Sequence, residues 1–287
     1  MKVGIQLYSV RRALKRDPYG TLAKVAAAGY RYVEAANHDA MQDDGVGFGV
    51  PAGRLKESLD KLGMRIIGCH INPLRLDRLP AVLDYHQALG NRQIGCDIEF
   101  YPYNDRDFLM GRCELFNRVG AMCKERGMRF YYHNHFQEFQ KFGDQTVYEL
   151  VMENTDPELV KIELDTYWVL RGGGNPIELM KKYRDRVVLL HQKDFPKQAP
   201  QPLVMYDGVI QPTADISDEV FTATKNPGCF TEIGTGVLDI QQIIDAGAEC
   251  PDLKYMILEQ DETRMPNEID SIDTSMKAFR RFKNIEL

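Results

Sequence analysis

The stretch GMRFYYHNH, residues 127–135, contains the three features that decide the fold of this chain. It opens on a glycine of the kind that ends a helix in the left-handed conformation, continues as an apolar run, and closes on two histidines. The order glycine, any residue, arginine, apolar run occurs four times, beginning at Gly29, Gly63, Gly90 and Gly127. A helix–glycine–strand unit repeated every ~27 to 37 residues is typical of successive βα units.

Eight short apolar runs alternate with helical stretches along the whole chain. The predicted strands are Lys2–Tyr8, Tyr30–Ala35, Arg65–His70, Gln93–Ile98, Arg129–His135, Lys161–Thr166, Val187–Lys193 and Lys254–Gln260. Most are near-continuous apolar runs, as expected of strands covered on both faces in a parallel sheet. Eight βα units fit a closed barrel better than an open doubly wound sheet, and no G-x-G-x-x-G follows the first strand. The sequence therefore predicts one α/β domain over residues 1–287, a (β/α)8 TIM barrel.

Residues 196–228 form the one long irregular segment, which is rich in Pro, Gln and Asp and follows the seventh predicted strand. In such a barrel this position belongs to the face that carries the active site. Loops of this length are more often lids or binding loops than simple connections. We therefore predict that this segment is a lid over the barrel mouth.

The composition argues against several classes of partner. The 36 basic residues are dispersed among 42 acidic ones and give a net charge of −6, so no basic patch predicts binding to nucleic acid or to an acidic membrane. The opening MKVGIQLYSV resembles a strand rather than a secretion signal, and no apolar run approaches the roughly 20 residues of a membrane span. Six scattered cysteines without a C-x-x-C pair indicate reduced, structural thiols in a cytoplasmic protein. Assembly into a homo-oligomer is left open.

Polar residues stand at the carboxyl ends of four late strands, where the side chains of a barrel point into the catalytic mouth. The pairs are His133 and His135, Glu163 and Asp165, His191 and Lys193, and Glu259 and Asp261. Because side chains alternate along a strand, the two members of each pair share a face. If these faces point inward, carboxylates and imidazoles meet at one point, where a divalent cation would neutralise them. Mixed ligands of this kind suit Mn²⁺, Co²⁺ or Zn²⁺, and Mg²⁺ less well.

Each of these residues also has a purely structural explanation. A single aspartate at a strand end, such as Asp165, often caps the following helix. His133 and His135 could be hydrogen-bonded core residues, and Lys193 could form a solvated pair with Asp194. One polar strand end can arise by chance, but four polar strand ends in one barrel are much less expected to do so. A functional site is therefore the stronger hypothesis.

Other residues keep two interpretations. His70 is either a substrate contact or a packed histidine, and Glu34 either points inward or caps a helix. Trp168 is either a flat wall for a sugar ring or a core residue. His38 and His86 are predicted at the surface.

The segment EIGTG, residues 232–236, resembles a phosphate-binding loop only superficially. Its glycines lack a long strand before them and a Lys-Ser or Lys-Thr pair after them. A tight turn before a helix capped near Asp239 is predicted instead. Glu232, the first residue of this segment, is a candidate substrate contact.

Several blocks of the sequence resemble a known family. They are VGIQLYSVR, YYHNHFQEF, KIELDTYWVLRGGGNP, VVLLHQKD, TEIGTGVLDI and YMILEQD, and they occur over essentially the whole chain. Together they resemble the sugar phosphate isomerase/epimerase proteins of the xylose isomerase-like TIM barrel superfamily. The combination is specific to the superfamily and not to a substrate.

The resemblance implies one divalent metal ion, with Mn²⁺ expected, held by residues from strands five to eight. On the matching positions the ligands are Asp165, His191 and Glu259. Many relatives have a glutamate at the end of strand five, where this chain has His133, and Glu138 follows five residues later. Glu138 is the predicted fourth ligand, because a second carboxylate beside Glu259 balances the charge of the metal, and His133 is the alternative.

The predicted reaction is a metal-assisted proton transfer next to the carbonyl of a small sugar, through an enediolate, which gives isomerisation or epimerisation. Glu259 and His135 are the candidate acid and base, and Lys193 would offset charge on the enediolate oxygen. The candidate substrate contacts are His133, His70, Trp168 and Glu232.

Elimination from the same enediolate, by a dehydratase or lyase acting on a keto-sugar or inosose, is the close alternative. The HNHxxEF form of strand five resembles the relatives that are inosose dehydratase-like or act on oxidised sugars. A non-catalytic sugar-binding barrel is a further class. The last class is an abasic-site endonuclease. Such an enzyme needs a histidine-rich metal cluster and a basic face for DNA, and a chain with six histidines and a net negative charge does not predict either.

Overall fold

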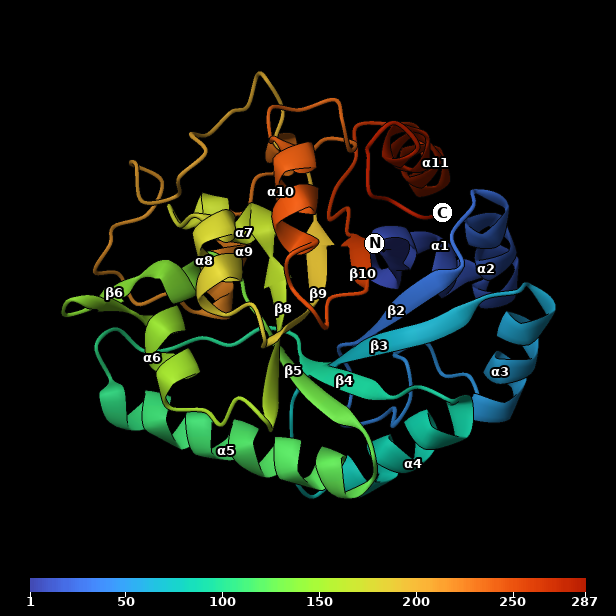
Figure 1. Cartoon of the computed structure of the whole chain (residues 1–287), viewed down its shortest axis with the longest axis horizontal. Helices are drawn as coiled ribbons and strands as arrows, with labels where there is room; N and C mark the ends of the chain where they lie inside the picture. The colour runs from blue at the N-terminus through green and yellow to red at the C-terminus, as the bar shows by residue number, and fades with distance from the viewer.

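The computed structural model describes all 287 residues and forms a closed barrel of eight parallel strands surrounded by helices (Figure 1). Around the barrel the strands follow the order β1, β10, β9, β8, β5, β4, β3, β2. They are β1 (Lys2–Gln6), β2 (Tyr32–Asn37), β3 (Arg65–Ile71), β4 (Gln93–Cys96), β5 (Arg129–His133), β8 (Val160–Asp165), β9 (Val187–Gln192) and β10 (Tyr255–Leu258). The predicted TIM barrel is confirmed, and all eight predicted strands are present.

The helices connect successive strands on the outside of the barrel. They are α1 (Arg11–Arg16), α2 (Pro18–Ala27), α3 (Ala52–Lys61), α4 (Leu79–Leu89), α5 (Arg106–Glu125), α6 (Val147–Glu153), α7 (Thr166–Arg171), α8 (Pro176–Lys182), α9 (Asp218–Thr224), α10 (Ile240–Gly247) and α11 (Glu268–Phe279). The short 3₁₀ helices are η1 (Leu7–Val10), η2 (Gln137–Phe139) and η3 (Pro227–Cys229). A small antiparallel hairpin of β6 (Lys141–Phe142) and β7 (Gln145–Thr146) adds to the predicted strands. No helix is both long enough and apolar enough to cross a membrane.

The four glycines of the repeated junction have the backbone conformation that the pattern predicts. Their φ angles are 110° at Gly29, 64° at Gly63, 87° at Gly90 and 66° at Gly127. A residue with a Cβ pays roughly 1–2 kcal/mol in this left-handed region, and glycine does not. Each glycine lies directly after an outer helix and just before a strand, so it lets the chain turn back into the barrel.

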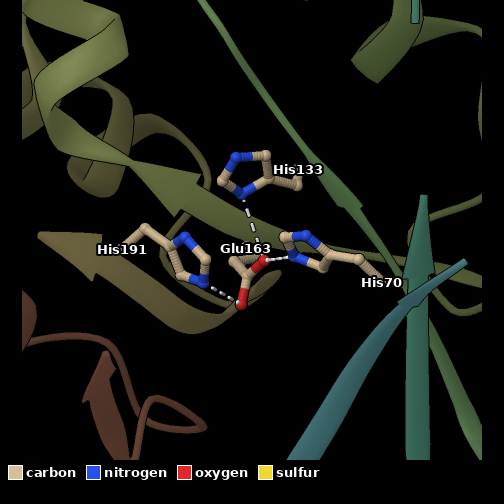
Figure 2. Close-up of side chains that lie close together, drawn as sticks. All are labelled: His70, His133, Glu163 and His191. Carbon is tan, nitrogen blue, oxygen red and sulfur yellow. Dashed lines mark hydrogen bonds and ion pairs between the residues drawn. The ribbon is translucent and has the colours of Figure 1, made fainter. Parts of the chain in front are cut away.

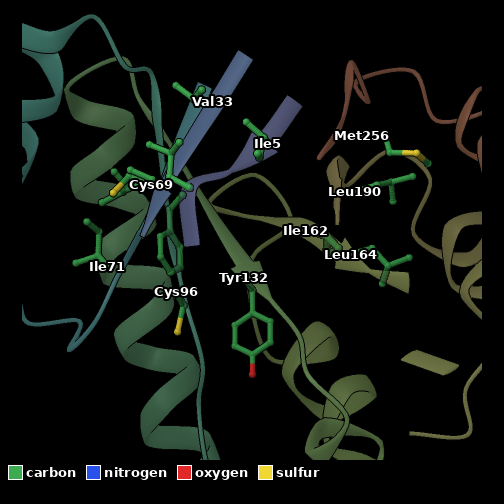
Figure 3. Packing of buried hydrophobic residues seen from close by; sticks show 14 of the residues in the cluster. Ile5, Val33, Cys69, Ile71, Cys96, Tyr132, Ile162, Leu164, Leu190 and Met256 are labelled. Carbon is green, nitrogen blue, oxygen red and sulfur yellow. The ribbon is translucent and has the colours of Figure 1, made fainter. Parts of the chain in front are cut away.

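The main apolar core lies between the strands and the helices. It is a cluster of 61 buried residues to which every barrel strand contributes. Figure 3 shows part of it, including Ile5 of β1, Val33 of β2 and Leu190 of β9. All six cysteines are buried and free, which confirms the predicted structural thiols. This outer layer holds the barrel together and leaves the other face of each strand to point inward.

The interior of the barrel has an apolar floor. It is a small buried cluster that includes Ile67, Tyr131, Leu189 and Ile257. Tyr131, Leu189 and Ile257 each stand two positions before a polar residue at the carboxyl end of the same strand. These polar residues are His133, His191 and Glu259, respectively. Because side chains alternate in and out, the floor lies directly below the polar strand ends.

The prediction that His86 is exposed is wrong. The side chain is fully buried, and its Nδ1 lies 3.2 Å from Asn91 Nδ2. Burial lowers the pKa of His86 to about 4. The sequence contains the signal, because His86 follows Val82 and Leu83 at helical spacing and therefore shares their apolar face on α4.

Gly95 of β4 makes room for the ring of Tyr131 in the floor. A Cβ at Gly95 would lie 2.0 Å from Tyr131 Cε2, whereas a Cβ at the exposed Gly111 of α5 would meet nothing within 4 Å. Gly95→Ala should lower the free energy of unfolding by about 1–3 kcal/mol, because the added methyl displaces the ring. Gly111→Ala should raise it by about 0.5–1 kcal/mol through backbone entropy. Urea unfolding measures both, and a neutral Gly95→Ala would contradict this account of the floor.

Candidate active site

The polar strand ends meet above the floor. His70 of β3, His133 of β5, Glu163 of β8 and His191 of β9 are all buried. Figure 2 shows the three imidazoles arranged around the carboxylate of Glu163. His70 Nε2 lies 2.6 Å from Glu163 Oε2, and His133 Nδ1 lies 3.1 Å from the same oxygen. His191 Nε2 lies 3.2 Å from Glu163 Oε1. The predicted convergence of strand ends is therefore present, with Glu163 at its centre.

A second group shares two of these histidines. His133, Asp165, His191 and Glu259 offer ligand atoms that all lie within 4.8 Å of one another, and so do the four residues of Figure 2. In this second group His191 Nδ1 lies 2.9 Å from Glu259 Oε2. His133 Nε2 lies 3.9 Å from Asp165 Oδ2. Two imidazoles and two carboxylates at this spacing are a donor set that suits a divalent metal ion.

Asp165 is both a helix cap and a member of the metal-binding candidate group. Its Oδ1 accepts a hydrogen bond from the backbone N–H of Trp168 at 2.8 Å and so caps α7. Its Oδ2 accepts a hydrogen bond from Lys193 Nζ. The two interpretations of this residue from the sequence are therefore compatible.

Lys193 is buried between the two carboxylates of the second group. Its Nζ donates to Asp165 Oδ2 and, at 2.5 Å, to Glu259 Oε2. Burial alone would lower the pKa of Lys193, but the two carboxylates raise that pKa well above its ordinary value. Burial alone would raise the pKa of Glu259, but Lys193 and then His191 hold that pKa well below its ordinary value. Lys193 and Glu259 are therefore both charged at neutral pH.

A cavity of about 500 Å³ opens beside the group, with Glu259 and His135 in its wall. His135 Nδ1 is buried without a hydrogen-bond partner. Burial, followed by the charge of His133, holds the pKa of His135 well below its ordinary value, so its imidazole is neutral. His38 and Asp97 line another part of the wall, and His38 Nε2 lies 3.1 Å from Asp97 Oδ2. The cavity therefore contains several groups able to accept or donate a proton.

Residues 196–228 cover one side of this cavity. Phe221 of α9 lies in its wall together with Asp218, Thr222, Lys225 and Pro227. The Phe221 ring stacks on Phe136 at 5.5 Å and contacts Trp168 at 5.6 Å between ring centroids. Lys225 Nζ lies 2.8 Å from Asp261 Oδ2 at the end of β10. The segment thus packs against the barrel mouth where the sequence predicts a lid.

Glu138, the predicted fourth metal ligand, lies outside both groups. It belongs to η2, and its Oε1 accepts a hydrogen bond from Tyr132 Oη at 2.8 Å. Its Oε2 accepts one from the backbone N–H of His135 at 3.0 Å. Burial raises the pKa of Glu138 to about 8. The structure instead brings His133, the alternative, into both groups.

None of the four predicted substrate contacts lines the cavity: His70 and His133 lie in the group around Glu163, and Trp168 and Glu232 contact other parts of the protein. Trp168 is buried, and its ring lies 5.7 Å from Lys193 Nζ. Glu232 accepts hydrogen bonds at Oε1 from Thr263 Oγ1 at 2.5 Å and from Ser271 Oγ at 2.8 Å, so it ties the segment before α10 to α11.

Two residues of the early strands also belong to the site. Glu34 of β2, whose orientation the sequence leaves open, points inward, and its Oε2 lies 2.6 Å from His191 Nε2. Asp97, which the sequence analysis does not name, follows β4, and its Oδ1 lies 3.2 Å from His70 Nδ1. Both stand at the end of an apolar run, which is the same signal that marks the late strands.

Asp194 explains the glycine-rich turn at residues 232–236. Its carboxylate accepts four backbone N–H groups, from Phe195, Gly234, Gly236 and Leu238, at 2.9 to 3.2 Å. A Cβ at Gly236 would lie 2.2 Å from Asp194 Oδ1, so only glycine allows this approach. The N–H groups that would cradle a phosphate in a phosphate-binding loop are bound here by the protein's own carboxylate. The predicted tight turn, followed by the Asp239 cap of α10, is confirmed.

A closed parallel barrel with buried carboxylates and imidazoles at the carboxyl ends of its strands defines a TIM barrel with a candidate metal site at its mouth. Residues 22–282 match the family model described as xylose isomerase-like TIM barrel, and the chain belongs to this family. The resemblance drawn from the sequence blocks is thereby confirmed.

Solved structures share the fold over nearly the whole chain. A sugar phosphate isomerase/epimerase from Parabacteroides distasonis ATCC 8503 has a TM-score of 0.74 at 24% identity and covers 97% of this chain and 93% of its own. The structure of IOLI protein with a bound zinc atom has a TM-score of 0.66 at 13% identity, and the match covers 99% of this chain and 100% of that protein. At these identities the likeness shows the fold alone.

Curated relatives include inosose dehydratases. The one from Clostridium botulinum is 28% identical over 187 residues, which is 64% of this chain and 56% of that protein. The one from Lacticaseibacillus casei is 28% identical over 164 residues, which is 56% of this chain and 49% of that protein. The chain spans about half the length of these relatives.

Because Asp194 accepts four backbone N–H groups, replacing it by asparagine, which has the same shape, should destabilise the protein. Asp194→Asn replaces one acceptor oxygen by an NH₂ group that faces backbone donors, which should lower the free energy of unfolding by about 1–3 kcal/mol. Asp239→Asn is the matched control, because asparagine caps a helix as well as aspartate and should change stability by less than about 0.5 kcal/mol. Thermal and urea unfolding compare the two, and equal values would contradict the role of Asp194.

Proposed function

We propose that the protein is a metal-dependent enzyme that removes a proton next to the carbonyl of a small polyhydroxy ketone and then eliminates water from it. The observation that carries this proposal is the group His133, Asp165, His191 and Glu259, whose ligand atoms lie within 4.8 Å of one another beside the cavity. We propose His133 as the fourth ligand rather than Glu138, because the Glu138 carboxylate is bonded to Tyr132 and to the backbone.

The charges of the site fit a divalent cation. Glu34, Glu163, Asp165 and Glu259 bring four carboxylates into one buried region, and Lys193 is the one amine that contacts any of them there. Buried charges of one sign are costly unless cations or protons compensate them. A divalent ion held by the group would supply Lewis-acid polarisation of the substrate carbonyl. Two imidazoles and two carboxylates suit Mn²⁺, which we propose, and also Co²⁺ or Zn²⁺.

The proton transfers are assigned to residues in the cavity wall. Glu259 and His135 are proposed as the groups that take the proton from carbon, since both line the cavity and His135 Nδ1 has no partner within the protein. Lys193 is proposed to offset the negative charge that develops on the substrate oxygen. His38, held by Asp97 in the same wall, is proposed to protonate the departing hydroxyl.

The cavity favours an uncharged substrate over a phosphorylated one. Lys225 is the one lysine or arginine in its wall, and its amine is already paired with Asp261. The carboxylates in the wall are Asp97, Asp218, Glu259, Asp261 and Glu262. A wall with this excess of negative charge repels a phosphate group. An inosose, the substrate in the name of the dehydratase relatives, therefore fits the proposal better than a sugar phosphate does.

Isomerisation or epimerisation is the second candidate, because it begins with the same proton transfer. Elimination differs only in needing an acid for the leaving hydroxyl. Two observations favour elimination: the second proton donor, His38, in the cavity wall, and the dehydratase names of the curated relatives.

The reaction is tested with an inosose, free keto-sugars and their phosphates in D₂O. We expect protein treated with EDTA to be inactive, and Mn²⁺ or Co²⁺ to restore loss of one water from the unphosphorylated ketone. NMR and mass spectrometry of the isolated product measure this. A product of unchanged formula that carries deuterium on carbon would show isomerisation instead, and full activity of the metal-free protein would refute the metal.

Three variants test the ligand set within the same experiment. Asp165→Asn and His133→Ala should each lower bound metal at least about tenfold, because each removes one ligand. Asparagine still caps α7, but it removes one of the two carboxylates that pair with the buried Lys193, so the first variant should also lose some thermal stability. Glu138→Gln is the matched control and should keep its metal. Normal metal content in His133→Ala together with loss in Glu138→Gln would reverse the assignment.

We also propose that residues 196–228 act as a lid that responds to ligand. Trp168 is the single tryptophan and lies against Phe221 of this segment, so its fluorescence reports on the segment. An inosose should change the Trp168 emission and slow proteolysis within residues 196–228. Phe221→Ala should shift the emission to longer wavelength in the free protein, because the indole becomes more exposed. Emission and cleavage that do not respond to any member of the ketone panel would contradict the lid.

A further inference from the structure

In both His133 and His191, one ring nitrogen faces the carboxylates of the proposed metal site, and the other ring nitrogen faces carboxylates on the opposite side. On one side lie Asp165 and Glu259, the carboxylates of the proposed metal site. On the other side, deeper in the barrel, lies Glu163 (Figure 2). An imidazole can bind a metal through one nitrogen only if the proton is on the other, so the partner of the second nitrogen decides how it binds.

For His191 the deeper nitrogen is Nε2. It lies 2.6 Å from Glu34 Oε2 and 3.2 Å from Glu163 Oε1, so it faces two carboxylates. Glu163 Oε1 is buried and accepts no hydrogen bond, and Glu34 Oε2 is the nearer of the two oxygens to His191 Nε2. The other nitrogen, Nδ1, lies 2.9 Å from Glu259 Oε2 on the side of the proposed metal.

For His133 the deeper nitrogen is Nδ1, which lies 3.1 Å from Glu163 Oε2. Its other nitrogen, Nε2, lies on the side of Asp165, at 3.9 Å from Oδ2. The two histidines therefore use opposite ring nitrogens toward the metal site, and Glu163 is the one carboxylate that both contact on the deeper side.

His70 completes the surroundings of Glu163. Its Nε2 lies 2.6 Å from Glu163 Oε2, and its Nδ1 lies 3.2 Å from Asp97 Oδ1, so both ring nitrogens face carboxylates. His70 therefore holds the Glu163 carboxylate in position from β3. In the strand order of the barrel, β3 lies opposite β9, the strand that carries His191.

We propose that Glu163 is a positioning residue for the metal site: it accepts the N–H of His133 at Oε2 and places its unpaired Oε1 beside the His191 N–H that Glu34 accepts, and thereby turns His133 Nε2 and His191 Nδ1 to the metal. This inference rests on the proposed function. Carboxylates that hold histidine ligands in this way are worth about 10–100-fold in metal affinity. Their effect is on metal binding, so it is separable from the stability of the barrel.

The test uses the full chain and Zn²⁺ as the probe. Metal-free wild type and Glu163→Gln are titrated with Zn²⁺ against a competing chelator, and we expect the variant to bind about 10–100-fold more weakly. Nitrogen-15 NMR of labelled histidines then reports the protonated nitrogen in the zinc-loaded wild type. We expect His133 to carry its proton on Nδ1 and His191 on Nε2, and Glu163→Gln to lose this fixed pattern at one or both.

The control is Glu99→Gln, which removes a part-buried carboxylate that is paired with Arg112 and contacts none of the site histidines. It should bind Zn²⁺ as the wild type does. The melting temperature of each metal-free protein shows whether a variant folds. If Glu163→Gln does not fold, the histidine NMR of the wild type alone decides the question.

The outcomes separate this inference from the proposed function. Wild type that binds Zn²⁺ with the opposite tautomers, or Glu163→Gln with unchanged affinity and tautomers, would overturn the role of Glu163 and leave the metal enzyme intact. A wild type that binds neither Zn²⁺ nor Mn²⁺ would overturn both.

Discussion

The burial of Glu163 inside the barrel is the constraint on which the rest of the site depends. An ionised carboxylate removed from water must be surrounded by protons or cations, and three imidazoles from three strands supply the surroundings here. These imidazoles reach it from the inward faces of β3, β5 and β9. In the strand register His133 pairs directly with Glu163, whereas His191 pairs with Asp165, two residues further along β8.

The same constraint limits what the mouth can bind. Three cations at or near the cavity already have a carboxylate partner within the protein: Lys225 pairs with Asp261, Arg11 pairs with Glu262, and Lys193 pairs with Glu259. The glycine-rich turn is occupied in the same way by Asp194. A phosphate would have to displace one of these internal anions, whereas a neutral polyol can use the carboxylates as hydrogen-bond acceptors. The electrostatics of the whole mouth therefore agree with an uncharged substrate.

The sequence predicts the barrel well because each βα unit carries its own local signals, the left-handed glycine and the apolar run. It also predicts which strand ends converge, since alternation decides which residues face inward. It does not decide which nitrogen or oxygen of a side chain faces which partner, because that depends on contacts between distant strands, as for Glu34 and His191. The prediction for His86 is wrong for a simpler reason. Histidine as a residue type favours the surface, but the position of His86 on the apolar face of α4 outweighs that preference.

The fourth metal ligand shows how position outweighs ligand type. Charge balance favours Glu138, but this residue lies beyond the end of β5 in η2, where its carboxylate satisfies the N–H of His135. His133 lies on the strand itself and points inward. A carboxylate ligand has no proton to donate, whereas an imidazole ligand has a second nitrogen whose N–H must be accepted in a buried site. A histidine at this position therefore requires an acceptor deeper in the barrel, and Glu163, paired with His133 in the neighbouring strand, is placed to be that acceptor. On this argument the two residues form one unit, and replacing His133 by glutamate would leave Glu163 with one fewer proton donor and bring two carboxylates together.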